Sequence, residues 1–125
     1  TIPTSFTDLT SLKYLDLSNN GLFGDIIPFS GFNQLKEIDL SNNEITGDVP
    51  EFSPFTTMTV ISLGNNLLEG TIPYSYSGMI HLETLNLQHN NIGGEIPSLF
   101  NLGDLISLTL NDNNLYGTFS DLVHT

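Results

Sequence analysis

Apolar and polar residues alternate at regular intervals along the chain. Five pairs of leucine or isoleucine recur along the chain, and one polar residue separates the two members of each pair. The pairs are Leu15 and Leu17, Ile38 and Leu40, Ile61 and Leu63, Leu85 and Leu87, and Leu108 and Leu110. This period of two is typical of a β-strand that buries one face. The pattern predicts five short strands, one centred on each pair.

The strand pattern belongs to an internal repeat that fills the chain. Two sets of residues recur at intervals of 23, 23, 24 and 23. The first set is the asparagines Asn20, Asn43, Asn66, Asn90 and Asn113, and the second is the glycines Gly24, Gly47, Gly70, Gly94 and Gly117. A mostly aromatic column comprises Phe6, Phe29, Phe52, Tyr76, Leu99 and Leu122. A repeat of this length is one coil of a solenoid, which buries its apolar face only against neighbouring coils. We expect a single domain over 1–125, with a partial repeat at 1–11 and full repeats starting near 12, 35, 58, 82 and 105.

The repeated positions predict how each coil is built. Leu12, Leu15, Leu17, Leu22 and Ile26 are expected to point into the first full coil. The asparagine column is expected to form a ladder, because a buried amide can pair the turn backbone of its own coil and of the next. The glycines lie where the chain turns sharply.

One copy of the repeat reads LKEIDLSNNEITGDVP from Leu35 to Pro50. The consensus LxxLxLxxNxLxGxIP resembles the plant-type subclass of leucine-rich repeats. The resemblance implies an α/β-type repeat solenoid, mostly β and irregular: a right-handed coil of about five 23–24-residue repeats with a parallel concave β-sheet. Members of this subclass are typically ectodomains of receptor-like kinases and receptor-like proteins, or secreted inhibitors. It therefore implies a non-enzymatic module that recognises a protein or peptide, at an extracellular or cell-surface location, although the chain itself shows no signal peptide.

The chain departs from the plant pattern at its ends, because it has no cysteine and so lacks cysteine-bearing caps. An uncapped solenoid exposes its core at each end. We expect the 125 residues to be a piece of a longer array. The alternative is a structural protein whose coils stack end to end into a filament or matrix.

The charge of the chain narrows the choice of partner. Two Lys and Arg residues against 14 carboxylates give a net charge of −12. Nucleic acid and anionic membrane surfaces require cationic side chains, so neither is an expected partner. The acidic surface favours a basic protein or peptide.

Side chains that lie between the inward leucines should form the concave recognition face. The candidate ligand-binding residues are Tyr14, Asp16, Glu37, Asp39, Ser62, Asn86, Gln88, His89 and Thr109. Our hypothesis is that a basic segment anchors on Asp16, Glu37 and Asp39, with Tyr14 stacking beside it. The alternative is that these residues are ordinary solvated positions on a strand.

Other chemistries find little support in the sequence. A second column, Asp25, Asp48, Thr71, Glu95 and Thr118, offers at most one carboxylate per coil, whereas calcium takes six to eight oxygens. No metal or cofactor is therefore expected. Ice binding would require regularly spaced threonines, and Thr71 and Thr118 belong to this column. Because acidic residues occupy its other positions, ice binding is set aside. No nucleophile elbow, HExxH pair or phosphate-binding glycine loop occurs, and His81 and His89 are expected to be surface histidines.

Overall fold

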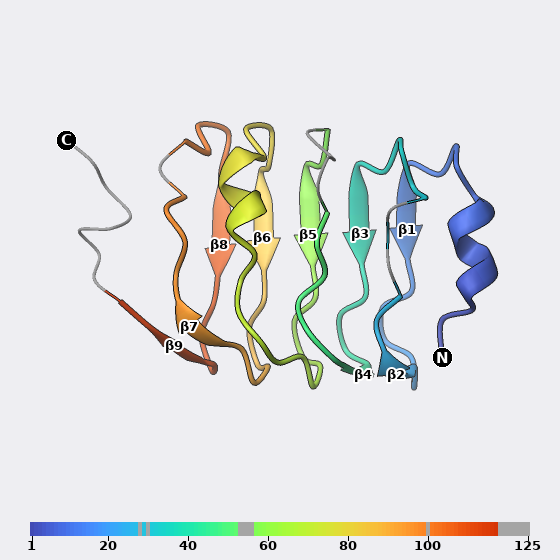
Figure 1. Ribbon diagram of the computed structural model, residues 1–125, viewed down its shortest axis with the longest axis horizontal. Helices are drawn as coiled ribbons and strands as arrows, with labels where there is room; N and C mark the ends of the chain where they lie inside the picture. Colours follow the sequence, from blue (N-terminus) through green and yellow to red (C-terminus); the bar gives the residue numbers. More distant parts are fainter. Residues whose placement is uncertain (28, 30, 53–56, 100, 118–125) are drawn as a thin grey trace.

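The chain folds as a solenoid whose coils each contribute one strand to a parallel sheet (Figure 1). The computed structural model describes residues 1–27, 29, 31–52, 57–99 and 101–117. The sheet has the order β1-β3-β5-β6-β8. Its strands are β1 (Tyr14–Asp16), β3 (Glu37–Asp39), β5 (Val60–Ser62), β6 (Thr84–Asn86) and β8 (Ser107–Thr109). These are the five strands that the apolar alternation predicts, and the leucine-rich-repeat coil is confirmed.

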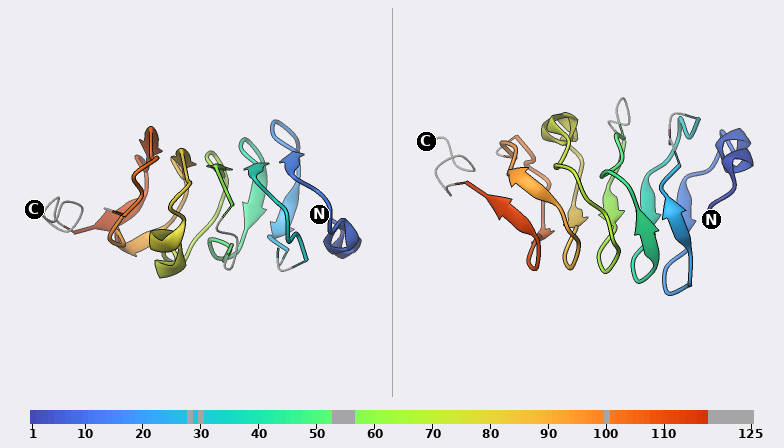
Figure 2. Two further views of the ribbon diagram at one scale, coloured as in Figure 1. Left: turned by 90° about the horizontal axis from the view of Figure 1, so that it is seen from above. Right: turned by 60° about the horizontal axis from the view of Figure 1, so that its bottom comes forward.

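The opposite side of the solenoid is less regular. Two 3-10 helices, η1 (Thr4–Asp8) and η2 (Tyr74–Gly78), lie there, away from the sheet (Figure 2). The flank carries two short parallel pairs, formed by β2 (Phe23–Asp25) with β4 (Glu44–Thr46) and by β7 (Gly93–Glu95) with β9 (Asn114–Tyr116). Sequence analysis predicted neither the helices nor these pairs. Its assignments for Thr118 and Leu122 lie outside the described residues. No helix among the described residues is long and apolar enough to cross a bilayer.

The core is a continuous column of side chains that runs through the stacked coils. Ile38, Ile61 and Leu85 are fully buried, whereas Leu108 in the last strand is 40% exposed. A coil therefore buries its apolar face only where it has neighbours on both sides. Aromatic rings extend the core behind the sheet, with centroids 5.2 Å apart for Phe29 and Phe52 and 6.0 Å apart for Phe52 and Tyr76.

Asparagines tie each coil to the preceding one. The Asn66 side chain donates to the carbonyls of Leu40 and Leu63 at 3.0 and 3.1 Å, and its Oδ1 accepts from the Ile45 N–H at 3.0 Å. Asn43, Asn90 and Asn113 make equivalent contacts. Asn20, in the first full coil, donates only to carbonyls of its own coil among the described residues. The ladder pairs backbone groups that the turns withdraw from water.

Candidate functional site

The parallel register places the candidate residues in straight rows across the sheet. Tyr14 pairs with Glu37 and Glu37 with Val60, and the row continues to Thr84 and Ser107. A second row runs from Asp16 through Asp39, Ser62 and Asn86 to Thr109. Because alternate residues of a strand point to opposite faces, both rows lie on the face away from the leucine core.

The acidic end of this face is hollowed. A cavity of about 190 Å³ is lined by Tyr14, Asp16, Glu37, Asp39, Val60 and the strand backbone around them. Tyr14 is 60% exposed, so its ring stands at the edge of the hollow without packing into the core. The structure thus brings together the four residues that the sequence hypothesis proposes as an anchor for a basic ligand.

Two carboxylates at this end are held in the same orientation by the turn that follows each strand. Oδ1 of Asp16 accepts from the N–H and the hydroxyl of Ser18 at 2.9 and 2.7 Å. Oδ1 of Asp39 accepts from the same groups of Ser41 at 2.9 and 2.6 Å. The Ser18 N–H, with the hydroxyl as a second donor, lowers the pKa of Asp16 below its ordinary value of 3.8. Asp16 is therefore ionised at neutral pH and restricted in rotation before any ligand arrives.

The other end of the face is neutral. Asn86 holds the position of Asp39, and its Oδ1 accepts from the Gln88 N–H at 3.2 Å. Ser62, Asn86, Gln88 and Thr109 are all half-buried, with hydroxyl or amide groups in place of carboxylates. The candidate residues thus divide into an acidic end on β1 and β3 and an uncharged end on β5, β6 and β8.

His89 occupies a special backbone position. Within the described part of the chain, five non-glycine residues have a positive φ, between 51 and 58°. They lie at the same turn of successive coils: Asn19, Asn42, Asn65, His89 and Asp112. Asn, Asp and His are enriched in this left-handed region, so the turn explains the residue types of this column. The His89 side chain is exposed, with Nδ1 3.3 Å from Oδ2 of Asp112. The other histidine singled out in the sequence, His81, is likewise at the surface, 3.2 Å from Asp104.

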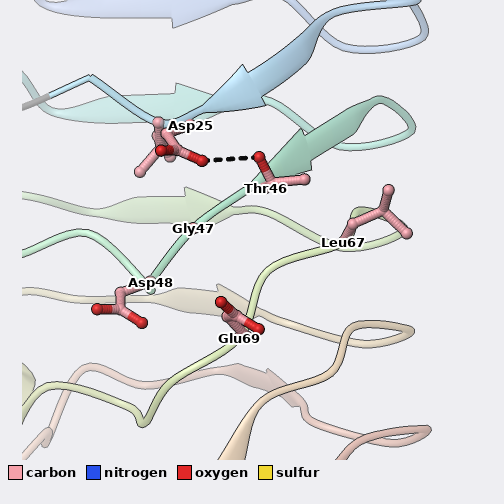
Figure 3. Close-up of a pocket in the computed structure, with 7 residues that line it drawn as sticks. Asp25, Thr46, Gly47, Asp48, Leu67 and Glu69 are labelled. Carbon is pink, nitrogen blue, oxygen red and sulfur yellow. Dashed lines mark hydrogen bonds between the residues drawn. The ribbon is translucent and has the colours of Figure 1, made fainter.

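A second hollow, of about 470 Å³, lies on the flank of the coils outside the concave face (Figure 3). Its acidic residues are Asp25, Asp48 and Glu69, and Oδ1 of Asp25 accepts from the Thr46 hydroxyl at 2.8 Å. Across the described ranges, no three His, Cys, Asp or Glu side chains are grouped so that they could hold a metal ion. The described part of this flank therefore presents negative charge.

Comparison with known proteins identifies the repeat. Two family models, both described as leucine rich repeat, match residues 2–45 and 78–96. No curated protein matches the sequence. Three similar solved structures are each 36% identical to the chain.

Two of these structures are receptor ectodomains from Arabidopsis. The ectodomain of the receptor kinase GASSHO1/SCHENGEN3, in complex with Casparian strip integrity factor 2, has a TM-score of 0.86, with 92% of this chain and 14% of that one covered. The ectodomain of the receptor kinase HAESA, in complex with an extended IDA peptide hormone, also gives 0.86, with 91% and 20% covered.

The third structure is a plant ice-binding protein, with a TM-score of 0.83 and with 91% of this chain and 38% of that one covered. The chain therefore spans well under half of the length of each of these three proteins. The repeat motif, the coil and the two family matches agree with one another. The chain is a leucine-rich-repeat protein of the plant type, similar to the ectodomains of receptor-like kinases.

Proposed function

We propose that the chain is a non-enzymatic recognition module that binds a protein or peptide on the concave face of its sheet, in an extracellular or cell-surface setting. The observation that carries this proposal is the hollow between β1 and β3, where Tyr14, Asp16, Glu37 and Asp39 gather on a rigid sheet. The two similar Arabidopsis ectodomains are complexes with a peptide hormone in one case and a named factor in the other. That precedent supports binding, and the residues of this chain indicate the chemistry.

The acidic end favours a basic group in the ligand. Asp16 and Asp39 are partners in neighbouring strands, which lie about 4.8 Å apart, so their negative charges repel each other. A lysine ammonium or an arginine guanidinium placed between them relieves that repulsion and forms charge-assisted hydrogen bonds. The serine contacts hold both carboxylates in position, which lowers the entropy cost of binding.

The neutral end then serves the ligand backbone. An extended peptide offers an N–H and a C=O at each residue, and both need partners when water is displaced. Ser62, Asn86, Gln88 and Thr109 supply hydroxyl and amide groups that can donate or accept. On this proposal the charged end binds the basic side chain of the peptide, and the neutral end hydrogen-bonds to the rest of the peptide backbone.

Selection of random-sequence displayed peptides on the immobilised chain tests the proposal. We expect the bound peptides to be enriched in Lys and Arg, and their retention to fall at least about tenfold on Asp16→Asn/Asp39→Asn. The matched control is Asp48→Asn/Glu69→Gln, which changes the net charge by the same amount on the flank and should leave retention nearly unchanged. Equal losses with both variants would show that only the overall charge attracts the peptides, and the concave anchor would then be rejected.

Ice binding is a second candidate, because one similar structure is a plant ice-binding protein. The observation that favours it is a column of asparagines at the same turn of three consecutive coils: Asn19, Asn42 and Asn65 share a left-handed backbone, with φ values of 56, 58 and 56°. Carboxamides repeated at one coil spacing can hydrogen-bond to an ordered array of water molecules. In the two following coils the same position is held by His89 and Asp112, so the asparagine column is limited to three coils.

An ice-recrystallisation assay separates the two candidates. If the asparagine row binds ice, the chain inhibits recrystallisation at low concentration and Asn42→Asp weakens the inhibition, whereas Asp16→Asn/Asp39→Asn does not. Recrystallisation at the same rate as in a control protein solution would eliminate this candidate and leave peptide recognition unaffected.

A further inference from the structure

A third hollow, of about 520 Å³, lies on the flank of the C-terminal coils. It is lined by residues of η2, β7 and β9, by the segment that precedes η2 and by the segment that follows β7. The strands β7 and β9 lie apart from the five-stranded sheet (Figure 2, right). Its volume falls in the range of small-ligand sites. The side chains that give it chemical character are Tyr74, Tyr116, Ile72, Pro97, Glu95 and Ser98.

Two tyrosines of this hollow expose their rings to solvent. Tyr74 is 78% exposed and Tyr116 is 62% exposed, although rings of this size are usually covered. Tyr116 belongs to the same repeat column as Glu69, which lines the acidic hollow of Figure 3. The hollow of the C-terminal coils thus carries two exposed rings and Glu95, whereas the lining of the hollow in Figure 3 includes three carboxylates and no aromatic residue.

One residue in the wall of the hollow, Ser98, carries a buried polar atom without a partner. The Ser98 hydroxyl oxygen is buried and makes no hydrogen bond, the only side-chain atom in this condition across residues 1–27, 29, 31–52, 57–99 and 101–117. A buried polar group left unpaired destabilises the fold. The Ser98 oxygen has almost no surface open to the hollow, so Ser98 shapes the wall and the polar contact to a ligand falls to Glu95.

We propose that this hollow binds a segment of a neutral saccharide chain. A pyranose ring presents C–H groups on its faces, which pack on the electron-rich faces of tyrosine rings, and hydroxyls at its edge. Glu95, which is exposed, accepts hydrogen bonds from those hydroxyls. Glu95 and the net charge of −12 oppose acidic sugars, so the ligand class is a neutral glycan and not a uronate polymer.

Titration of the ¹⁵N-labelled chain with cellohexaose, followed by NMR, tests this inference. We expect saturable shifts centred on residues 72–74, 94–98 and 116, with a Kd on the order of 1 mM. Tyr74→Ala and Tyr116→Ala should each raise the Kd about tenfold, whereas Tyr116→Phe, which keeps the ring, should not. Ser98→Ala should leave the Kd nearly unchanged and the stability of the free chain unchanged or higher, because it removes a buried hydroxyl that has no hydrogen-bond partner.

Two control variants and one control ligand make the result specific. Phe23→Ala removes an exposed ring from the same repeat column in the first full coil, and Tyr14→Ala removes one from the concave face; neither should change the Kd for cellohexaose. Trigalacturonate should produce no saturable shifts. Flat titrations with cellohexaose, equal losses in the control variants, or tighter binding of trigalacturonate would each overturn the proposal. The outcome is independent of peptide recognition, since the two sites share no residue.

Discussion

Replacing Asn66 by alanine removes a carboxamide from the middle of the asparagine ladder. The Ile45 N–H then loses the Oδ1 to which it donates at 3.0 Å, inside a buried turn. The carbonyls of Leu40 and Leu63 lose one donor each but keep another, from Asn43 and Asn90 respectively. The substitution therefore leaves one backbone N–H unpaired and removes one of the hydrogen bonds that each of the two carbonyls accepts.

The contacts set the expected size of the effect. An unpaired buried N–H costs about 1–3 kcal/mol, and each lost hydrogen bond about 0.5–1.5 kcal/mol. Allowing for the carbonyls that keep a partner, Asn66→Ala should lower the free energy of unfolding by about 2–4 kcal/mol. Asn20→Ala is the matched control: Asn20 is exposed and donates only to carbonyls of its own coil, so its loss should cost under about 1 kcal/mol.

Equilibrium urea unfolding followed by circular dichroism measures both values. The m-values of the two variants must agree with that of the parent chain, because a change in m signals a loss of cooperative unfolding. A cost below about 1 kcal/mol for Asn66→Ala, or equal costs at both positions, would refute the conclusion that the ladder ties neighbouring coils together.

Two further outcomes follow from single contacts. Tyr76→Phe removes the hydroxyl that donates to the Pro50 carbonyl at 2.9 Å in the core, and should lower the free energy of unfolding by about 1–3 kcal/mol. The control, Tyr74→Phe at the surface, should lower it by under about 0.5 kcal/mol. Equal losses in the two variants would contradict a stabilising role for the Tyr76 hydrogen bond. Because hydrogen bonds from Ser18 depress the folded-state pKa of Asp16, its contribution to stability is present above pH 3.8 and is lost as the pH falls through the folded pKa. In an NMR titration Ser18→Ala should raise that pKa only partway toward 3.8, since the backbone donor remains, and an unchanged pKa would show that the hydroxyl has no part.

The concave side of the fold could be predicted from the sequence because its constraints are local and repeated. Pairs such as Ile38 and Leu40 enforce a strand with one buried face, and the constant spacing forces the strands into register. The rows Asp16–Asp39 and Tyr14–Glu37 follow from that register alone. What the rows could not reveal is the serine contact that holds each aspartate, because it depends on the backbone of the turn.

The opposite side could not be read in the same way. The helices η1 and η2 have no helical periodicity, but in both coils the spacing from the motif proline to the first residue of the strand is eleven, from Pro3 to Tyr14 and from Pro73 to Thr84. Other copies have nine or ten. In these two coils that spacing has room for a turn of 3-10 helix. The left-handed turn at His89 was not predicted. The polar residues at this position, mostly Asn, are typical both of such a turn and of a binding surface, and His89 was counted as a ligand-binding residue.

The central claim is that the acidic end of the concave face recognises a basic ligand. An NMR titration of the ¹⁵N-labelled chain with an acetylated, amidated peptide that contains two lysines tests it most directly. We expect the largest amide shifts at residues 14–18 and 37–41, reduced at higher salt as screening shortens the reach of the charges, and abolished by Asp16→Asn/Asp39→Asn. Shifts centred instead on the acidic flank at Asp25, Asp48 and Glu69, or spread evenly over the surface, would contradict the claim.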